Sequence, residues 1–375
     1  SVMLQFAIPC LLGLESLVGD EVKKLGLADV RVENGRVLCR GEERDLARLN
    51  INLRCGARVL LVLASFHATD FETLFQGTRA VRWEEWIPRE GEFPVTGYSI
   101  NSTLHSVPAC QSIVKKAIVS RLGAAYGLET LPESGKRYQI RFSIMKDEVM
   151  LCLDASGEGL YKRGYRAVGV AAPLKETLAA AMVKLSHYNG RDPFCDPFCG
   201  SGTIAIEAAL IAKNRAPGLN RSFAAQHWAM VDKKIWLDAA DEAMDNEFQD
   251  KTYEIWGGDI DPHAIEIARH NAELAEVDDT VRFEVDDATR FHWGGLYGRV
   301  VTNPPYGERL LVQKEAEELY RAFGRAMAKL PETWRIYVLS SHTEFERCFG
   351  READKKRKLY NGMLKCDLFM YGKRL

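Results

Sequence analysis

Long apolar runs are missing from this sequence. No stretch approaches the roughly 18 consecutive apolar residues that a membrane-spanning helix needs. The first residues also lack the basic-then-apolar order of a secretory signal peptide. These absences argue against a helical membrane protein and favour the cytoplasm as the compartment. Ser1 in place of Met suggests that a few native residues precede the printed sequence.

Cysteine patterns that bind metal or build a disulfide framework are also missing. The nine cysteines include no Cys-x-x-Cys pair and no cluster with histidine at metal-ligand spacing. They are typical of buried thiols in a reducing compartment, so no metal is expected. Cys195 and Cys199 flank a glycine turn, where a metal or redox role is the alternative. Small apolar residues for packing are the simpler explanation there.

A basic excess, the usual electrostatic signature of nucleic-acid binding, is absent as well, because the formal net charge is -2. A nucleic-acid partner must therefore contact a local patch. Residues 162–166 (Lys-Arg-Gly-Tyr-Arg) and 355–358 (Lys-Lys-Arg-Lys) are the two candidates. In the first segment Arg163 and Arg166 are the candidate contacts. A solvated charged surface is the alternative interpretation of both segments.

The composition is that of a globular protein, with 46% hydrophobic and 27% charged residues in 375, enough for two or three domains. In residues 1–65 the expected β-α-β-β-α-β order, with an Asn-Gly hairpin signal, predicts a ferredoxin-like domain. Residues 66–155 predict a second α+β domain. A glycine-rich linker is expected over 156–172. Alternating strands and helices in 173–375 predict a doubly wound, Rossmann-like α/β sheet.

Regular elements of the last domain can be placed from apolar runs and helical periodicity. An insertion at about 214–250 lengthens the first crossover and is expected to contribute a wall of the site. Strands are expected near 192–196, 253–258, 281–285, 298–303, 335–340 and 364–371, and helices near 203–213, 262–275 and 315–330.

Three strand ends in this domain carry chemistry. The first, residues 196–203 (Asp-Pro-Phe-Cys-Gly-Ser-Gly-Thr), joins a strand to a helix through a glycine turn, where bare backbone and free helix N–H groups suit a nucleotide-like cofactor. It is neither a full dinucleotide fingerprint nor a phosphate loop. The second ends in Asp259, as a ribose-binding carboxylate requires. Asp261 with Pro262 instead predicts a helix cap. The third is Asn303-Pro-Pro-Tyr306-Gly.

Together the three motifs resemble those of class I S-adenosylmethionine-dependent methyltransferases that modify exocyclic amino groups. S-adenosylmethionine is therefore the expected cofactor. Asp286 is a neighbouring candidate for the adenine contact. The resemblance implies that the cofactor contacts are Asp196, Pro197, Phe198, Gly200, Ser201, Gly202 and Thr203 at the methionine end, Asp259 and Ile260 at the ribose, and Asp287 and Ala288 at the adenine.

Asn303 and the two prolines after it suit an amine acceptor. The Asn303 side-chain oxygen and the Pro304 carbonyl can accept both N–H bonds of a base amine and favour a lone pair aimed at the methyl donor. Consecutive prolines make this array rigid. Tyr306 is expected to stack on the target base, and Arg309 is a candidate phosphate contact. A plain tight turn is the alternative, which the other two motifs argue against.

The N-terminal half carries a further resemblance. In residues 66–155, an extended strand, a helix with Lys115 and Lys116, and a hairpin resemble the THUMP domain, an RNA-binding module. A generic α+β domain is the alternative. Residues 162–166 followed by Ala-Pro-Leu-Lys175-Glu176-Thr177 resemble the start of the catalytic domain in THUMP-linked methyltransferases. This resemblance implies that residues 175–177 lie beside the methionine end of the cofactor.

The whole chain resembles the THUMP-containing methyltransferases that make N2-methylguanine in 23S ribosomal RNA, a family long labelled as N6-adenine DNA methylases. The resemblance implies a methyl transfer to guanine N2 of 23S ribosomal RNA or of a precursor of the large subunit. The motifs do not choose between guanine N2 and adenine N6. A tRNA guanine-N2 or DNA adenine-N6 methyltransferase remains open, as does a non-catalytic RNA-binding assembly factor. Methyltransferases of release-factor glutamine share Asn-Pro-Pro-Tyr but lack this N-terminal half.

Overall fold

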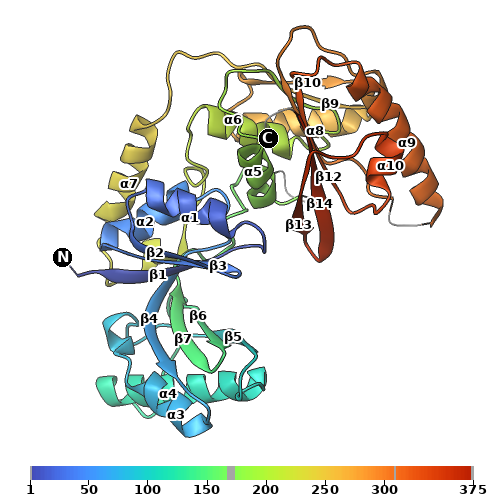
Figure 1. The fold of residues 1–375 in the computed structure, drawn as a ribbon. Helices are drawn as coiled ribbons and strands as arrows, with labels where there is room; N and C mark the ends of the chain where they lie inside the picture. Colours follow the sequence, from blue (N-terminus) through green and yellow to red (C-terminus); the bar gives the residue numbers. More distant parts are fainter. Residues whose placement is uncertain (1, 167–173, 308–309, 373–375) are drawn as a thin grey trace.

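The computed structural model describes residues 2–166, 174–307 and 310–372, and for residues 310–312 only the backbone (Figure 1). The described chain forms two seven-stranded sheets, one in each half. No helix among the described residues is long and apolar enough to cross a bilayer.

The first four strands form the ferredoxin-like unit that the sequence predicts. Their order is β2-β3-β1-β4, and every neighbouring pair is antiparallel. The two helices lie on one face, where Val18 and Leu46 are fully buried. The elements are β1 (Leu4–Pro9), α1 (Glu15–Lys24), β2 (Ala28–Glu33), β3 (Arg36–Gly41), α2 (Glu43–Asn52) and β4 (Leu60–His67).

The second unit continues the same sheet. Strand β4 pairs with β1 through residues 60–62 and with β7 along its whole length, so it belongs to both units. The sheet then ends in β6 and β5, which run parallel to each other. The second unit consists of α3 (Phe71–Arg79), β5 (Val95–Ile100), α4 (Val107–Tyr126), β6 (Ile140–Met145) and β7 (Glu148–Asp154).

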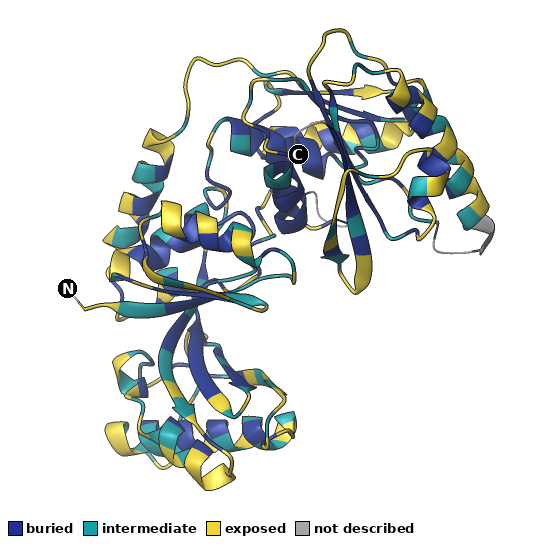
Figure 2. Ribbon diagram, in the orientation of Figure 1, coloured by how far each residue is buried: buried dark blue, intermediate teal, exposed yellow. Residues whose placement is uncertain are grey.

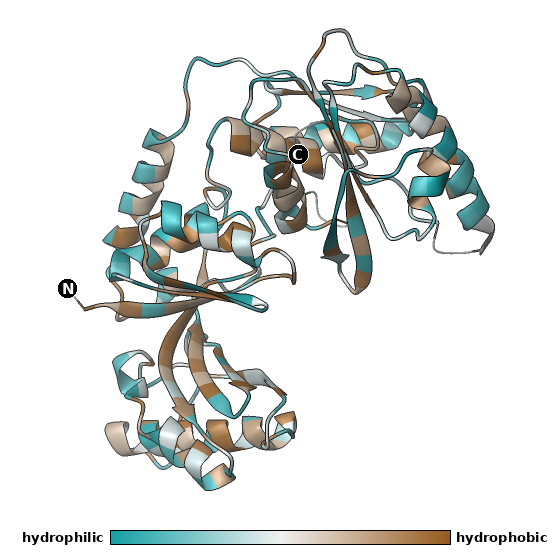
Figure 3. Ribbon diagram, in the orientation of Figure 1, coloured by the Kyte–Doolittle hydropathy of each residue, from teal (hydrophilic) through white to brown (hydrophobic). Residues whose placement is uncertain are grey.

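The C-terminal half is the predicted doubly wound sheet, with strand order β10-β9-β8-β11-β12-β14-β13. Strands β8 to β12 are parallel and β14 is antiparallel. Helices α5 and α6 are buried on nearly all sides and mostly apolar (Figures 2 and 3). The elements are α5 (Glu176–Leu185), β8 (Phe194–Asp196), α6 (Thr203–Ala212), α7 (Lys234–Asp245), β9 (Ile255–Asp259), α8 (Pro262–Leu274), β10 (Val281–Val285), β11 (Arg299–Thr302), α9 (Leu310–Ala328), β12 (Arg335–Ser340), α10 (Phe345–Phe349), β13 (Lys355–Asn361) and β14 (Leu364–Tyr371).

Strand β13 and the short helix α10 are elements of this half that the sequence did not predict, and β13 is the more informative of the two. Its first four residues are the Lys-Lys-Arg-Lys segment, which looked like a charged surface. These residues form an edge strand paired with β14, where charged side chains protect unpaired backbone from another strand. The charges therefore hid a strand because a strand at the sheet edge needs little apolar character.

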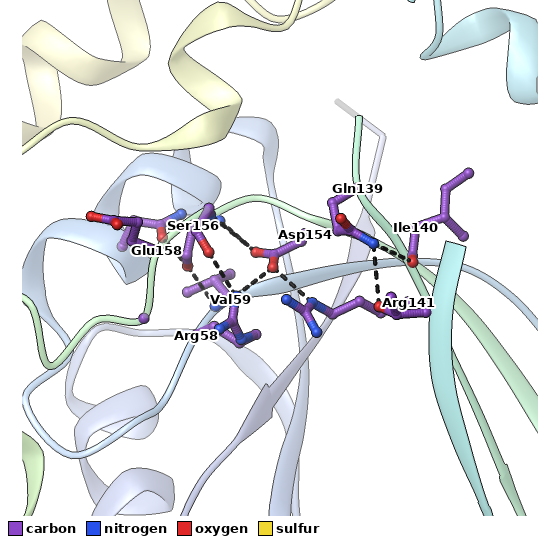
Figure 4. A network of polar contacts seen from close by, with 12 residues as sticks. Arg58, Val59, Gln139, Ile140, Arg141, Asp154, Ser156 and Glu158 are labelled. Carbon is purple, nitrogen blue, oxygen red and sulfur yellow. Dashed lines mark hydrogen bonds and ion pairs between the residues drawn. The ribbon is translucent and has the colours of Figure 1, made fainter. Parts of the chain in front are cut away.

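The two halves are joined by polar contacts around residues 154–166. Asp154 at the end of β7 accepts hydrogen bonds from Arg58 and Arg141, and its other oxygen accepts the Ser156 N–H at 3.0 Å (Figure 4). The two terminal nitrogens of Arg221, Nη1 and Nη2, donate to four carbonyl oxygens, those of residues 156, 158, 159 and 162. The segment is thus fixed between the two halves.

The insertion at 214–250 has a different place from the one expected. Helix α7 in this segment lies against α2, where Arg48 Nε donates to Glu242 Oε1 at 2.9 Å. The Gly218 N–H donates to the Ile51 carbonyl oxygen at 2.9 Å. None of its residues lines the cleft described below. The expectation that it forms a wall of the site is therefore wrong, because its apolar residues pack toward the N-terminal half.

Candidate active site

A cleft of about 800 Å³ lies at the carboxyl ends of β8, β9 and β11. The strand order reverses between β8 and β11, and open α/β sheets bind ligands at such a reversal. All three motifs meet there. The lining residues that the sequence predicted are Asp196, Pro197, Phe198, Gly200, Ser201, Thr203, Asp259, Ile260, Asp287, Ala288, Asn303, Pro304 and Tyr306.

The two glycines of the turn have different roles. Gly200 has φ +51°, and a Cβ added there would meet nothing within 4 Å, so its backbone faces open space in the cleft. Gly202 has φ +87°, and its added Cβ would lie 2.7 Å from the Phe283 ring. Gly202 does not line the cleft. Its glycine is required for the close packing of α6 against β10, and helix N–H groups open toward the cleft beyond it.

Asp196 is the buried carboxylate of the site, with 1% of its surface exposed. Its Oδ1 accepts hydrogen bonds from Thr302 Oγ1 at 2.5 Å and from the Phe198 N–H at 3.1 Å. Burial raises its pKa to about 7, although these two hydrogen bonds favour the ionised form. A cation bound in the cleft would stabilise the carboxylate and offset the cost of its burial.

Asp259 holds the glycine turn and lines the cleft at once. Its Oδ2 accepts the Gly200 N–H and its Oδ1 accepts the Asp261 N–H, each at 3.0 Å. A carboxylate offers about four acceptor positions, so two remain for hydroxyl groups. Asp261 caps α8 as predicted, since its side chain accepts the His263 N–H at 2.9 Å with Pro262 at the first helical position.

Of the two acids after β10, Asp287 lines the cleft and Asp286 does not. Asp287 Oδ1 accepts the N–H and the hydroxyl of Thr289, at 2.9 and 2.7 Å. These bonds lower the Asp287 pKa, so the group is ionised at neutral pH. The geometry therefore favours Asp287 as the acceptor at this end of the cleft.

Asn303 follows β11 directly and lines the cleft. Its Oδ1 is buried and has no hydrogen-bond partner among the described residues. A buried acceptor without a donor costs roughly 1–3 kcal/mol, which native structures seldom leave uncompensated. The oxygen therefore indicates a donor that a ligand supplies. Pro304, next to it, also lines the cleft.

Two side chains far along the sequence hold this loop. The hydroxyl of Tyr320, a fully buried residue on α9, donates to the Pro305 carbonyl oxygen and lies 3.0 Å from Ser340 Oγ. The Asn361 Nδ2 donates to the Tyr306 hydroxyl at 3.2 Å. Burial raises the Tyr306 pKa well above its usual value, so the phenol stays neutral. The loop is thus fixed from both sides.

Sequence reasoning missed the cleft residues that come from the C-terminal hairpin. Asn361 and Leu364 form the last pair of β13 and β14 and line the cleft beside Tyr306. Gly362 was the available signal, since glycine at the first of two turn residues is typical of a tight hairpin. Further lining residues not predicted are Leu174, Cys199, Ile204, Asp261, His263, Ala264, Ile267, Pro305 and Leu319.

Residues 175–177 lie beside the cleft but do not line it, whereas Leu174 does. The Glu176 carboxylate is buried and accepts from Arg166 Nη2 at 2.8 Å, and burial raises its pKa to about 7. Lys175 lies over the Tyr161 ring, 4.7 Å from its centroid. Direct cofactor contact by these three residues is therefore not supported by their position. Arg166 is half-buried and engaged, so it is a poor candidate for RNA.

The prediction that Arg163 contacts RNA is wrong. Only 2% of it is exposed, and Nη2 donates to Glu207 Oε1 and to the Arg54 carbonyl oxygen, each at 2.8 Å. It joins the two halves of the chain. Lys115 is also engaged, since its Nζ lies 2.7 Å from Glu133 Oε1, whereas Lys116 is exposed. Arg309 lies outside the described residues.

Comparison with family models shows which protein family has this domain. Residues 163–369 match the model described as the RMKL-like methyltransferase domain. The chain belongs to the RMKL-like methyltransferases. In this RMKL-like chain residues 5–60 match the RlmL ferredoxin-like domain and residues 68–154 match the THUMP domain.

Relatives of similar length support the same grouping. The protein named "Putative RNA methyltransferase YpsC" from Bacillus subtilis (strain 168) is 44% identical over 362 residues, which are 96% of this RMKL-like chain and 94% of the relative. A crystal structure described as a "predicted N6-adenine-specific DNA methylase" from Listeria monocytogenes is 46% identical, with 99% and 96% coverage and a TM-score of 0.93. SMU.472, "a putative methyltransferase complexed with SAH", is 42% identical, with full coverage of both chains (100% each) and a TM-score of 0.92.

Proposed function

We propose that this protein methylates an exocyclic base amine of RNA, namely guanine N2 in 23S ribosomal RNA or a precursor of the large subunit. The coarser assignment, a THUMP-containing S-adenosylmethionine-dependent RNA methyltransferase, follows from the family match and from the relative YpsC. The single observation that supports amine methylation is the buried Asn303 Oδ1 without a donor, beside Pro304.

The cofactor is S-adenosylmethionine, since SMU.472 is described in complex with SAH and aligns over the whole chain. Bound in the cleft, it supplies a methyl group on a positively charged sulfur. The residues fit it. Gly200 exposes backbone to open space, and Asp196 offers a buried carboxylate for the ammonium group. Asp259 has acceptor positions left for the ribose hydroxyls, and Asp287 is an ionised acceptor for the adenine amine.

The chain's own residues orient the acceptor amine. Asn303 Oδ1 and the Pro304 carbonyl oxygen accept its two N–H bonds, which leaves the nitrogen lone pair free. Tyr320 fixes the Pro305 carbonyl, and Asn361 fixes Tyr306, whose neutral ring is available for stacking on the base. The amine nitrogen gains the methyl group and loses one hydrogen as a proton. Such catalysis depends on positioning and electrostatics.

Adenine N6 and guanine N2 satisfy the same two acceptors, so the loop does not choose between them. The THUMP match and the name of YpsC favour RNA, whereas the name of the Listeria protein includes a DNA methylase. A tRNA guanine, a DNA adenine and a non-catalytic role in ribosome assembly are therefore the alternatives that the test must separate.

The test incubates the protein with labelled S-adenosylmethionine and, separately, unmodified 23S RNA, tRNA and duplex DNA. Digestion and mass spectrometry identify the labelled nucleoside. We expect N2-methylguanosine from 23S RNA. Label found only in tRNA or only in DNA would contradict 23S RNA as the substrate and identify tRNA or DNA instead. No label from any of them, with RNA affinity equal for wild type and Asn303→Ala, would favour a non-catalytic binding protein.

A further inference from the structure

The outer wall of the cleft is a tight hairpin. Asn361 and Leu364 line the cleft and are the last cross-strand pair of β13 and β14. Only two residues, Gly362 and Met363, connect them. Gly362 has φ +63°, the conformation that a two-residue hairpin turn of this kind requires at its first position. We name residues 361–365 the hairpin tip.

Met363 stands at the apex of the hairpin tip with 99% of its surface exposed. Figure 2 shows the end of this hairpin coloured as exposed. Scattered exposed apolar residues are ordinary on proteins. Met363 differs by its place, because the two residues that flank its turn line the cleft that contains Asn303.

The hairpin is held at a fixed angle to the cleft. Inside the cleft, Asn361 binds the Tyr306 hydroxyl at 3.2 Å. On the other side, Arg357 Nη2 donates to the Gly13 carbonyl oxygen at 2.6 Å and lies 3.3 Å from Ser16 Oγ. The hairpin thus extends from the catalytic sheet toward the N-terminal half (Figure 1). These hydrogen bonds hold the hairpin in place beside the cleft.

Two lysines lie on the strands of this hairpin, Lys365 in the hairpin tip and Lys358 three residues before it. Lys358 on β13 and Lys365 on β14 are exposed, and neither forms a salt bridge with any residue in the described part of the chain. Phosphate groups are the partners that exposed lysines meet in nucleic-acid complexes. The hairpin therefore combines an apolar apex and Lys365 in the tip with a second exposed lysine, Lys358, further along β13 and opposite Asp367.

The depth of Asn303 requires that the target base leaves its helix. Its Oδ1 is buried, so a base amine stacked inside a duplex cannot reach it. Enzymes that act on such a base rotate it out of the stack, and nucleic-acid-binding proteins often insert an apolar side chain where stacking is lost.

We propose that Met363 is the wedge that enters the RNA helix and fills the space left by the flipped target base, while Lys358 and Lys365 contact the flanking phosphates. This inference rests on the proposed function. The unbranched methionine side chain suits an irregular space of this kind.

The test measures base flipping and methylation separately. One RNA duplex carries 2-aminopurine at the target position, and its fluorescence rises when the base leaves the stack. A second pair of RNAs presents the target guanine either base-paired or unpaired. Met363→Ala is compared with wild type and with Met230→Ala, a matched variant of a methionine that is 57% exposed and does not line the cleft.

For Met363→Ala we expect the 2-aminopurine fluorescence change to be about tenfold smaller than for wild type. The single-turnover rate on the paired target should also be about tenfold lower. Without the methionine side chain, no apolar group replaces the stacking that the flipped base loses. The rate on the unpaired target and the affinity for SAH should stay unchanged. Met230→Ala should match wild type throughout.

An equal loss of rate on the paired and unpaired targets would contradict the wedge and assign Met363 to the wall of the cleft. Wild-type rates on both targets would also contradict the wedge. A wild-type protein that flips 2-aminopurine but methylates no RNA would contradict the proposed function and leave the wedge intact. A wild-type protein that methylates RNA without any rise in 2-aminopurine fluorescence would contradict the wedge and leave the proposed function intact.

Discussion

The hydroxyl of Tyr320 donates a hydrogen bond to the carbonyl oxygen of Pro305, although the two residues lie on different elements. Tyr320 is fully buried on α9 and also contacts Ser340 Oγ at 3.0 Å. The Asn-Pro-Pro-Tyr loop is therefore oriented from the protein interior, and its acceptors face the cleft.

Tyr320→Phe should lower kcat about tenfold, equivalent to ~1.4 kcal/mol, because the loop loses this hydrogen bond. The affinity for SAH should hold, since Tyr320 does not line the cleft. Tyr188→Phe is the control, because Tyr188 is buried and its hydroxyl has no partner among the described residues. Equal kcat values for the two variants would remove the positioning role of Tyr320.

Asn303→Ala should lower kcat by about 10²–10³-fold, the loss typical of a preorganised donor or acceptor. Its free energy of unfolding should stay within about 0.5 kcal/mol of wild type or rise, because the deleted oxygen has no partner in the described chain. Thermal unfolding and single-turnover kinetics measure the two effects. A large loss of stability would instead assign Asn303 to the architecture of the loop.

Asp196→Asn should change stability and ligand affinity in opposite directions. The raised pKa of about 7 means that the folded state binds a proton more tightly than the unfolded chain does. Wild-type stability on this account falls as pH rises from about 4 to 7, by ~1.4 kcal/mol for each unit of pKa shift. At pH 8 the variant should be more stable without ligand.

The affinity of wild type for SAH should fall as pH drops below about 7, because protonated Asp196 no longer attracts the ammonium group. Asp196→Asn should bind SAH weakly at every pH. Calorimetric titrations from pH 5.5 to 8.5 measure this, and a wild-type affinity that ignores pH over this range would contradict the ammonium contact.

The two turn glycines should respond differently to alanine. Gly202→Ala places a Cβ 2.7 Å from the Phe283 ring at φ +87° and should cost roughly 1–3 kcal/mol of stability. Gly200→Ala meets no atom within 4 Å and should cost less, but its methyl group enters the cleft and should weaken SAH binding. Chemical denaturation and SAH titration distinguish the pair. The reverse pattern would exchange the two roles.

Arg163→Met should destabilise the protein by about 3–5 kcal/mol, because the buried Glu207 carboxylate loses its cationic partner and keeps only the hydrogen bond from the Tyr165 hydroxyl. Lys162→Met is the control, since its ion pair with Glu158 is exposed and screened by solvent, so its loss should leave stability close to that of wild type. Urea unfolding measures both. A stable Arg163 variant with weaker, less salt-dependent RNA binding would restore the original RNA-contact prediction.

Much of the site could be predicted because each motif is local. A strand, a turn and a helix start within a few residues determine where Gly200, Asp259 and Asn303 point, and parallel strands bring their carboxyl ends together. Hydrophobic periodicity likewise predicted six strands of the second sheet. The seventh, β13, was missed since its charged residues mask the pattern at a sheet edge.

By itself the sequence determined the doubly wound sheet, the Asp261 cap and the loops that meet in the cleft, because these depend on neighbouring residues. Tertiary structure decided which charged side chains are exposed and which are buried in ion pairs. Arg163 looks like a surface residue in sequence, yet it lies against Glu207 in the interior. The tertiary structure also decided that the Asn361 side chain donates a hydrogen bond to the Tyr306 hydroxyl. Such partners are distant along the chain, and only folding brings them within hydrogen-bond distance.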